Sequence, residues 1–238
     1  MKSVSHFPAL LAVVILAAFS ACHSVSRYIN SEDVLSWEPD IAVFDSLNAV
    51  EPSDRETVLV TGSSSVRLWD SIHTDLAPYR IMQRGYGGAK LSDFNYYADR
   101  IIKPQPFKAI VIFVANDISG GDHDRAPREV FQLYRTLVKK IGERNADTPV
   151  FWIEITPTPS RWHAYPQVRK VSDLIRNYCS RHPDLYFIDT YDTFLNSAGT
   201  PDSTYFREDM LHLNHYGYRL WSEIIRNSLE EAGIRPSS

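Results

Sequence analysis

Two nearly continuous apolar runs constrain the fold of this chain most strongly. They read KAIVIFV over residues 108–114 and PVFWIEI over residues 149–155, and both are rich in β-branched and aromatic side chains. Strands of this kind are buried on both faces, as in a parallel sheet that helices cover on both sides. Shorter runs of similar character predict three more strands, at residues 57–60, 79–84 and 185–188.

Helical patterns separate these five strands along the chain. The helices are expected at residues 65–72, 91–102, 127–144, 166–181 and 215–231. An alternation of strand and helix with short connections predicts one α/β domain with a parallel five-stranded sheet, over residues 56–238. Glu154 lies inside the second long apolar run, although buried strands rarely contain an acidic residue.

Size and charge agree with a single globular enzyme or binding domain. The chain has 238 residues, of which 44% are hydrophobic, which is enough to bury a full core. Its formal net charge of -4 gives no electrostatic reason to expect nucleic acid as a partner. Of the two cysteines, Cys179 lies in a helical pattern and is expected in the core. The sequence has neither a Cys-x-x-Cys pair nor a His-Cys cluster with zinc spacing.

The first 22 residues predict a secretory signal peptide. Lys2 precedes an apolar run and a segment of small residues. Phe19-Ser20-Ala21-Cys22 resembles a bacterial lipobox, in which Cys22 would carry the lipid and anchor the protein to a membrane. Ordinary cleavage after Ser20 is the alternative, and either route leads to an extracytoplasmic protein. Residues 23–55 are expected to form a tether and an N-terminal helix around residues 40–48.

Polar motifs follow the predicted strands. In open parallel sheets the functional site lies at the carboxyl ends of the strands. The segments at this edge are GSSS after the first strand, RGYGGAK after the second, VANDI after the third, TPTPSRWH after the fourth and DMLHLN beyond the fifth. A hydroxyl, a glycine turn, an amide and an Asp-x-x-His motif are therefore expected to meet at one edge.

The chemistry of serine hydrolysis needs these residue types. A serine hydroxyl is a poor nucleophile until a base takes its proton, and His212 can be that base. Asp209 lies three residues earlier, so we expect the two side chains to meet on one helical turn, where Asp209 would orient the imidazole. Backbone N–H groups and an asparagine amide can stabilise the oxyanion, at about 3 kcal/mol each.

Four of these blocks resemble those of the SGNH or GDSL-type hydrolases, and GSSS stands where that family has Gly-Asp-Ser. The resemblance implies a flavodoxin-like three-layer α/β/α sandwich without a cofactor or metal. It also implies Ser64 as the nucleophile with Asp209 and His212, and an oxyanion hole formed by the N–H groups of Ser64 and Gly88 and the Asn116 side chain. Ser65 is expected to cap the following helix. Longer stretches resemble an extracytoplasmic subfamily with GSSS in its first block.

Two positions depart from the family pattern. Val114 stands where a glycine is usual, two residues before Asn116, and Ala89 replaces an acidic or hydroxyl residue. Both departures put the fit of the substrate in question. Arg161, Trp162 and His163, after the fourth strand, either line the substrate cleft or anchor a packed loop. His215 lies three residues beyond His212, but a metal pair would lack a third ligand with suitable spacing.

The sequence therefore predicts a serine esterase acting on a small-molecule or glycan ester, with acetyl esters of carbohydrate as the preferred class. A lysophospholipase or thioesterase is the alternative enzyme. A non-catalytic carbohydrate-binding protein on the same fold is the alternative outside enzymes. The sequence leaves the oligomeric state open.

Overall fold

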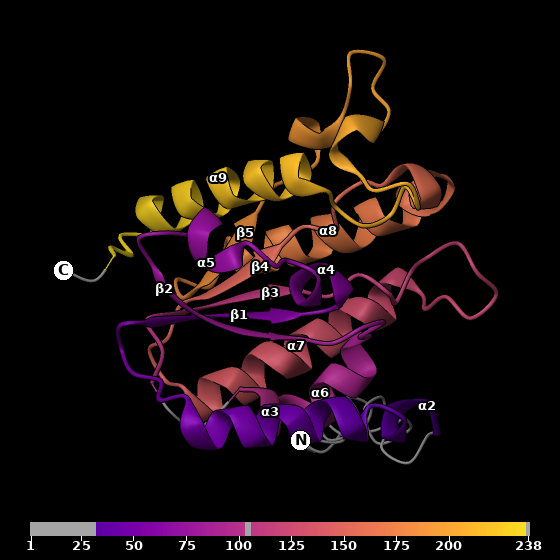
Figure 1. Ribbon diagram of the computed structural model, residues 1–238. Coiled ribbons are helices and arrows are strands. Elements are labelled where there is room, and N and C mark those ends of the chain that lie inside the picture. The colour runs from indigo at the N-terminus through magenta and orange to yellow at the C-terminus, as the bar shows by residue number, and fades with distance from the viewer. Residues whose placement is uncertain (1–31, 103–105, 237–238) are drawn as a thin grey trace, which may run out of the picture.

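A five-stranded parallel sheet forms the centre of the protein. The computed structural model describes residues 32–102 and 106–236. All five predicted strands are found, each within two residues of the expected range (Figure 1). They are β1 (Thr57–Gly62), β2 (Arg80–Gly85), β3 (Ala109–Phe113), β4 (Val150–Ile153) and β5 (Leu185–Ile188).

The strand order creates a switch point in the middle of the sheet. The order is β2-β1-β3-β4-β5, and every neighbouring pair is parallel. The chain leaves β1 toward one edge to make β2, and then returns to the other side of β1 to make β3. Crevices at such switch points are the usual binding sites of open α/β sheets. The topology therefore predicts the site between the carboxyl ends of β1 and β3.

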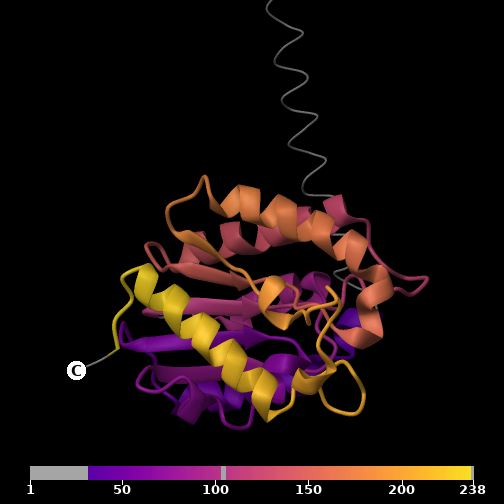
Figure 2. The ribbon, with the colours of Figure 1, turned by 90° about the horizontal axis from the view of Figure 1, so that it is seen from above.

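Helices cover both faces of this sheet, which confirms the predicted three-layer architecture. Figure 1 shows α9 and α5 on one side and α6 and α7 on the other, and Figure 2 shows α9 crossing over the strands. Helix α8 packs beside α7 and α3 beside α6. The longer helices are α3 (Glu38–Val50), α6 (Leu91–Ile101), α7 (Pro127–Arg144), α8 (Tyr165–Cys179) and α9 (His215–Glu231).

The N-terminal helix is part of the folded domain. A short helix, α2 (Glu32–Leu35), precedes α3, and Ile41 and Phe44 of α3 are buried in the core. The predicted signal peptide and Cys22 lie outside the described residues. Within residues 32–102 and 106–236, none of the helices has both the length and the apolar character of a membrane span.

The segment after β1 differs from the expected single helix at residues 65–72. It forms two one-turn helices, α4 (Ser64–Arg67) and α5 (Ile72–Asp75). The prediction that Ser65 caps this segment is wrong, because the helix already begins at Ser64. Ser63 occupies the N-cap position with extended backbone, and its side chain makes no capping hydrogen bond.

Aromatic packing joins the residues just after α4 to α9. The rings of Trp69 and Tyr218 stack at 5.2 Å, and Trp221 lies 5.8 Å from Trp69. The Tyr218 hydroxyl donates a hydrogen bond to the Ser65 carbonyl over 2.9 Å. Trp69 and Trp221 are buried, so their rings serve packing, and the hydrogen bond fixes the turn that follows β1.

Glu154 has a structural explanation. Strand β4 ends at Ile153, and the fully buried Glu154 carboxylate accepts hydrogen bonds from the backbone N–H groups of Thr190 and Tyr191, over 3.1 Å and 3.0 Å. Burial raises the pKa of this carboxyl group. The acid therefore ties the chain leaving β5 to the end of β4.

Substitution of one glycine in β1, with another in α7 as a control, tests how closely β1 and β3 approach. A Cβ atom on Gly62, whose φ is 141°, would lie 1.9 Å from the Phe113 carbonyl oxygen. We expect Gly62→Ala to lower the free energy of unfolding by about 1–3 kcal/mol or more. A Cβ atom on the exposed Gly142 in α7 would meet no other atom within 4 Å, so Gly142→Ala should raise this free energy by about 0.5–1 kcal/mol. Urea unfolding measures both changes, and equal stability of the two variants would show that β1 and β3 leave room for a side chain at residue 62.

Candidate active site

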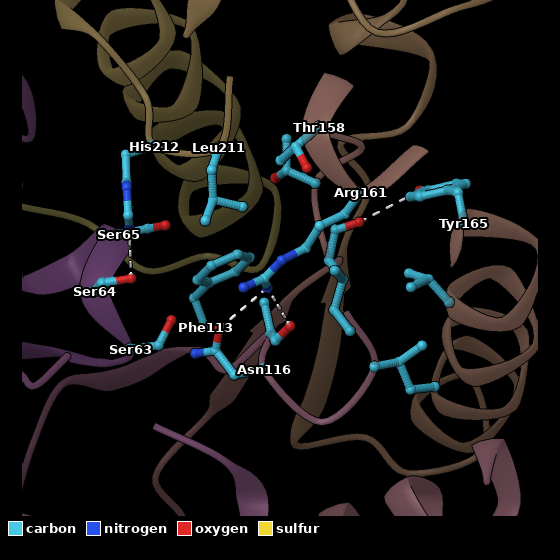
Figure 3. A pocket seen from close by; sticks show the side chains of 15 residues that line it. Ser63, Ser64, Ser65, Phe113, Asn116, Thr158, Arg161, Tyr165, Leu211 and His212 are labelled. Carbon is cyan, nitrogen blue, oxygen red and sulfur yellow. Dashed lines mark hydrogen bonds between the residues drawn. The ribbon is translucent and has the colours of Figure 1, made fainter. Parts of the chain in front are cut away.

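A small pocket opens at the carboxyl ends of β1, β3 and β4 (Figure 3). The loop that precedes α9 closes one side of it. The cavity has a volume of about 40 Å³, and its lining combines the polar residues of the predicted site with apolar side chains. The lining residues are Ser63, Ser64, Ser65, Phe113, Ala115, Asn116, Ile118, Ile155, Thr156, Thr158, Arg161, Tyr165, Val168, Leu211 and His212.

Three predicted residues form one hydrogen-bonded chain at the mouth of this pocket. His212 Nε2 lies 3.0 Å from Ser64 Oγ, and His212 Nδ1 lies 2.6 Å from Asp209 Oδ2 (Figure 3 shows the Ser64–His212 contact). If Nδ1 carries the proton that binds Asp209, Nε2 is left as an acceptor facing the serine hydroxyl. The arrangement can move a proton from Ser64 to His212.

Asp209 and His212 are held by a turn, so the expected helical turn is wrong. Asp209 Oδ1 accepts hydrogen bonds from the backbone N–H groups of Leu211 and His212, both over 2.9 Å. Met210 between them has a φ of 56°, which a helix does not allow. Partial burial alone would raise the pKa of Asp209, but the hydrogen bonds from the His212 side chain and backbone outweigh it and lower the pKa to about 2.

Ser64 and Asn116 place hydrogen-bond donors on the same pocket. Ser64 is the first residue of α4, and the first N–H groups of a helix have no acceptor within the helix. The side-chain Nδ2 of Asn116 donates one hydrogen bond to the Ala89 carbonyl over 3.0 Å. Because an amide NH₂ group has two hydrogens, the second is available for another acceptor.

Gly88, the third expected oxyanion donor, is not among the residues that line the pocket. Its φ is 68°, and a Cβ atom there would lie 3.1 Å from the Trp37 ring, so the position requires glycine. The contribution of the Gly88 N–H group stays a prediction.

The two departures from the family pattern lie in the core. Val114 and Ala89 are buried, and neither lines the pocket. Val114 therefore does not narrow the cavity with its side chain.

Asp117, next to Asn116, forms hydrogen bonds that connect two segments near the pocket. Its carboxylate accepts hydrogen bonds from the Leu91 backbone N–H over 2.9 Å and from Arg125 Nε over 3.0 Å. Burial raises the pKa of Asp117, and the Leu91 hydrogen bond and the Arg125 charge oppose that effect. The carboxylate thus joins the loop after β3 to the start of α6.

The segment after β4 contributes one of its three candidate residues to the pocket. Arg161 lines the pocket, whereas Trp162 and His163 do not. The Trp162 ring stacks on Tyr165 at 5.1 Å, and the His163 ring lies against Gly120. A role for Trp162 and His163 in substrate binding stays a prediction. Arg161 is a candidate from the sequence because functional residues follow parallel strands.

Metal ligands are not grouped in the described part of the chain. Residues 32–102 and 106–236 hold no group of three or more His, Cys, Asp or Glu side chains arranged to bind a metal ion. His215 begins α9 and its ring lies against Tyr216 at 3.7 Å, so it does not share a helical turn with His212.

Solved structures share this fold over most of their length. A Streptococcus pneumoniae protein provisionally described as a platelet activating factor has a TM-score of 0.72 at 17% identity, covering 92% of this chain and 99% of its own. A Bacteroides fragilis protein provisionally described as an acylhydrolase has a TM-score of 0.68 at 18% identity, with coverages of 81% and 96%. A GDSL-like lipase from Bacteroides thetaiotaomicron has a TM-score of 0.65 at 16% identity, with coverages of 81% and 98%.

Sequence comparison supplies the family. No curated protein sequence matches the chain. The family model described as GDSL-like Lipase/Acylhydrolase matches residues 55–220, which span the sheet, the pocket and most of the helices. The chain belongs to the GDSL-like lipase/acylhydrolase family.

Proposed function

We propose that the protein is a serine esterase that hydrolyses short acyl esters through an acyl-Ser64 intermediate. The observation that carries this proposal is the chain of contacts from Ser64 Oγ to His212 Nε2 and from His212 Nδ1 to Asp209, over 3.0 Å and 2.6 Å. An adjacent base with a third group that orients it is the arrangement that activates a serine. Membership of an acylhydrolase family supports the same chemistry.

The reaction follows from these positions. Ser64 Oγ attacks the ester carbonyl carbon while His212 Nε2 takes the hydroxyl proton, and Asp209 stabilises the resulting imidazolium. The oxyanion accepts hydrogen bonds from the N–H groups of Ser64 and Gly88 and from Asn116 Nδ2. His212 then returns the proton to the leaving alcohol. A water molecule attacks the acyl-serine with His212 again as base, which releases the carboxylic acid and restores Ser64.

The size of the pocket favours a short acyl group. The cavity is small, about 40 Å³, and it lies directly beside the Ser64 and His212 side chains. The apolar wall of Phe113, Ile155 and Val168 suits a methyl group. A lysophospholipase or an acyl thioesterase would need a long apolar trough for its chain. We therefore favour acetyl esters.

We propose that the alcohol part of the ester is a carbohydrate, because the sequence predicts a signal peptide. A protein exported through the signal at residues 1–22, with or without a lipid on Cys22, would meet acetylated glycans outside the cytoplasm. Its proposed location is therefore extracytoplasmic. No cofactor takes part in the proposed reaction.

Two serine variants and two model esters test the proposed activity. We expect Ser64→Ala to lower the hydrolysis of p-nitrophenyl acetate by on the order of 10⁴-fold or more, because the nucleophile is lost. The matched variant Ser65→Ala changes the neighbouring serine of the same pocket and should keep at least about a third of the wild-type rate.

The same assay separates the substrate classes. We expect p-nitrophenyl octanoate to have a lower kcat/KM than the acetate, because the pocket cannot hold the longer chain. A preference for octanoate would contradict the acetyl proposal and favour a lipolytic substrate. Equal rates for wild type and Ser64→Ala on both esters would contradict the esterase itself.

The pH profile tests the roles of His212 and Asp209. A protonated imidazole cannot accept the serine proton, so kcat/KM should fall as the solution is made acidic. Asp209, with its pKa of about 2, stays ionised above pH 4 and adds no inflection of its own there. Stopped-flow hydrolysis between pH 4 and pH 9 measures the profile. A rate that stays constant down to pH 4 would exclude His212 as the base.

A further inference from the structure

The side-chain amide of Asn116 lies between two groups of opposite hydrogen-bonding character. Its Oδ1 accepts a hydrogen bond from Arg161 Nη1 over 3.1 Å, and its Nδ2 donates one to the Ala89 carbonyl over 3.0 Å. Figure 3 shows the Arg161 side chain reaching into the pocket and ending against Asn116. Both ends of the amide are thus held by groups outside its own loop.

This environment permits one orientation of the amide. A half-turn about the last side-chain bond would point the Asn116 NH₂ group at the guanidinium, which has donors only, and its oxygen at the Ala89 carbonyl, which has acceptors only. Both hydrogen bonds would be lost and two repulsive contacts made. The orientation that remains keeps the second N–H of Asn116 available to the pocket that it shares with Ser64.

Arg161 is itself fixed in place. Its Nη1 also donates to the Ala115 carbonyl over 3.1 Å. Both of its hydrogen-bond acceptors are uncharged oxygens. Partial burial lowers the pKa of Arg161 and the charge of Asp124 opposes that effect, and a guanidinium stays protonated in proteins. The positive charge lies beside the proposed oxyanion donor, where it also polarises the Asn116 amide.

The element that carries Arg161 is joined to the loop that carries the base. Arg161 lies in η1 (Pro159–Ala164), and the Ser160 backbone N–H donates a hydrogen bond to the Met210 carbonyl over 3.0 Å. Met210 is in the turn between Asp209 and His212. This hydrogen bond therefore helps to fix the position of the guanidinium relative to the base, and the contact with Asn116 fixes it relative to the oxyanion donor.

We propose that Arg161 is a positioning residue of the oxyanion hole, which holds the Asn116 amide with an N–H directed at the developing oxyanion. This inference rests on the proposed esterase function. Arg161 does not belong to the hydrogen-bonded set of Ser64, His212 and Asp209. It would stabilise the transition state indirectly, by holding Asn116.

A double-mutant cycle on p-nitrophenyl acetate hydrolysis tests this coupling. Asn116→Ala should lower kcat by about 10²-fold, the usual loss for an oxyanion donor. Arg161→Met should lower kcat at least about tenfold with KM changed less than about threefold, because the interaction belongs to the transition state. In the Asn116→Ala background, Arg161→Met should cost less than about threefold. Arg161→Lys, which keeps the charge, should recover part of the loss.

Each other outcome of the cycle would overturn the proposal. Equal losses from Arg161→Met in both backgrounds would show that Arg161 acts independently of Asn116. A raised KM with unchanged kcat would make it a group that binds the ground state. Arg128→Met, which removes an exposed arginine, controls for the loss of a positive charge and should leave kcat unchanged.

A spectroscopic measurement separates this proposal from the esterase proposal. The Asn116 NH₂ resonances can be identified in a ¹⁵N–¹H spectrum by their loss in Asn116→Ala. In folded Arg161→Met we expect them to shift and broaden as the amide reorients, whether or not the wild type hydrolyses the ester. Unchanged resonances would overturn the positioning role. If Arg161→Met does not fold, the same spectrum of Arg161→Lys decides the question. Lysine keeps the charge but not the planar group that contacts Ala115 and Asn116, so the Asn116 resonances should still shift, and unchanged resonances together with a lowered kcat would overturn the positioning role.

Discussion

The close approach of β1 to β3 at the switch point is the constraint on which the site depends. Gly62 lies so near the Phe113 carbonyl that no side chain fits, and the next residue, Ser63, donates its backbone N–H to that carbonyl over 2.8 Å. Beyond this hydrogen bond the chain turns, and Ser64 begins α4. The nucleophile position and the Asn116 loop therefore follow directly from the point where β1 and β3 approach most closely in the buried sheet.

The remaining parts of the site are brought to this point by polar contacts between segments far apart in sequence. An aspartate-centred turn holds His212 against Ser64, and the low pKa of Asp209 follows from the hydrogen bonds of that turn. On the opposite side, Arg161 and the Ala89 carbonyl hold Asn116. The Ser160–Met210 hydrogen bond connects the two sides, so the base and the proposed oxyanion donor share one framework.

The sequence predicted the strands well because buried parallel strands need runs of β-branched and aromatic residues, such as those at residues 108–114. It predicted which segments meet, because parallel strands present their carboxyl ends at one edge. The prediction from sequence failed where one spacing is compatible with two backbone geometries. The three-residue step from Asp209 to His212 is compatible with a helix or with an Asx-type turn, and the positive φ of Met210 shows that the turn is formed. The Arg161 contact to Asn116 joins residues 45 positions apart, and no local pattern reveals it.

Covalent labelling tests whether Ser64 is the activated nucleophile. The purified protein is treated with a fluorophosphonate probe, digested, and the modified peptide is sequenced by mass spectrometry. We expect one adduct, on Ser64, in the wild type and in Ser65→Ala, and none in Ser64→Ala. An adduct on another serine, or equal labelling of the wild type and Ser64→Ala, would show that Ser64 is not the nucleophile.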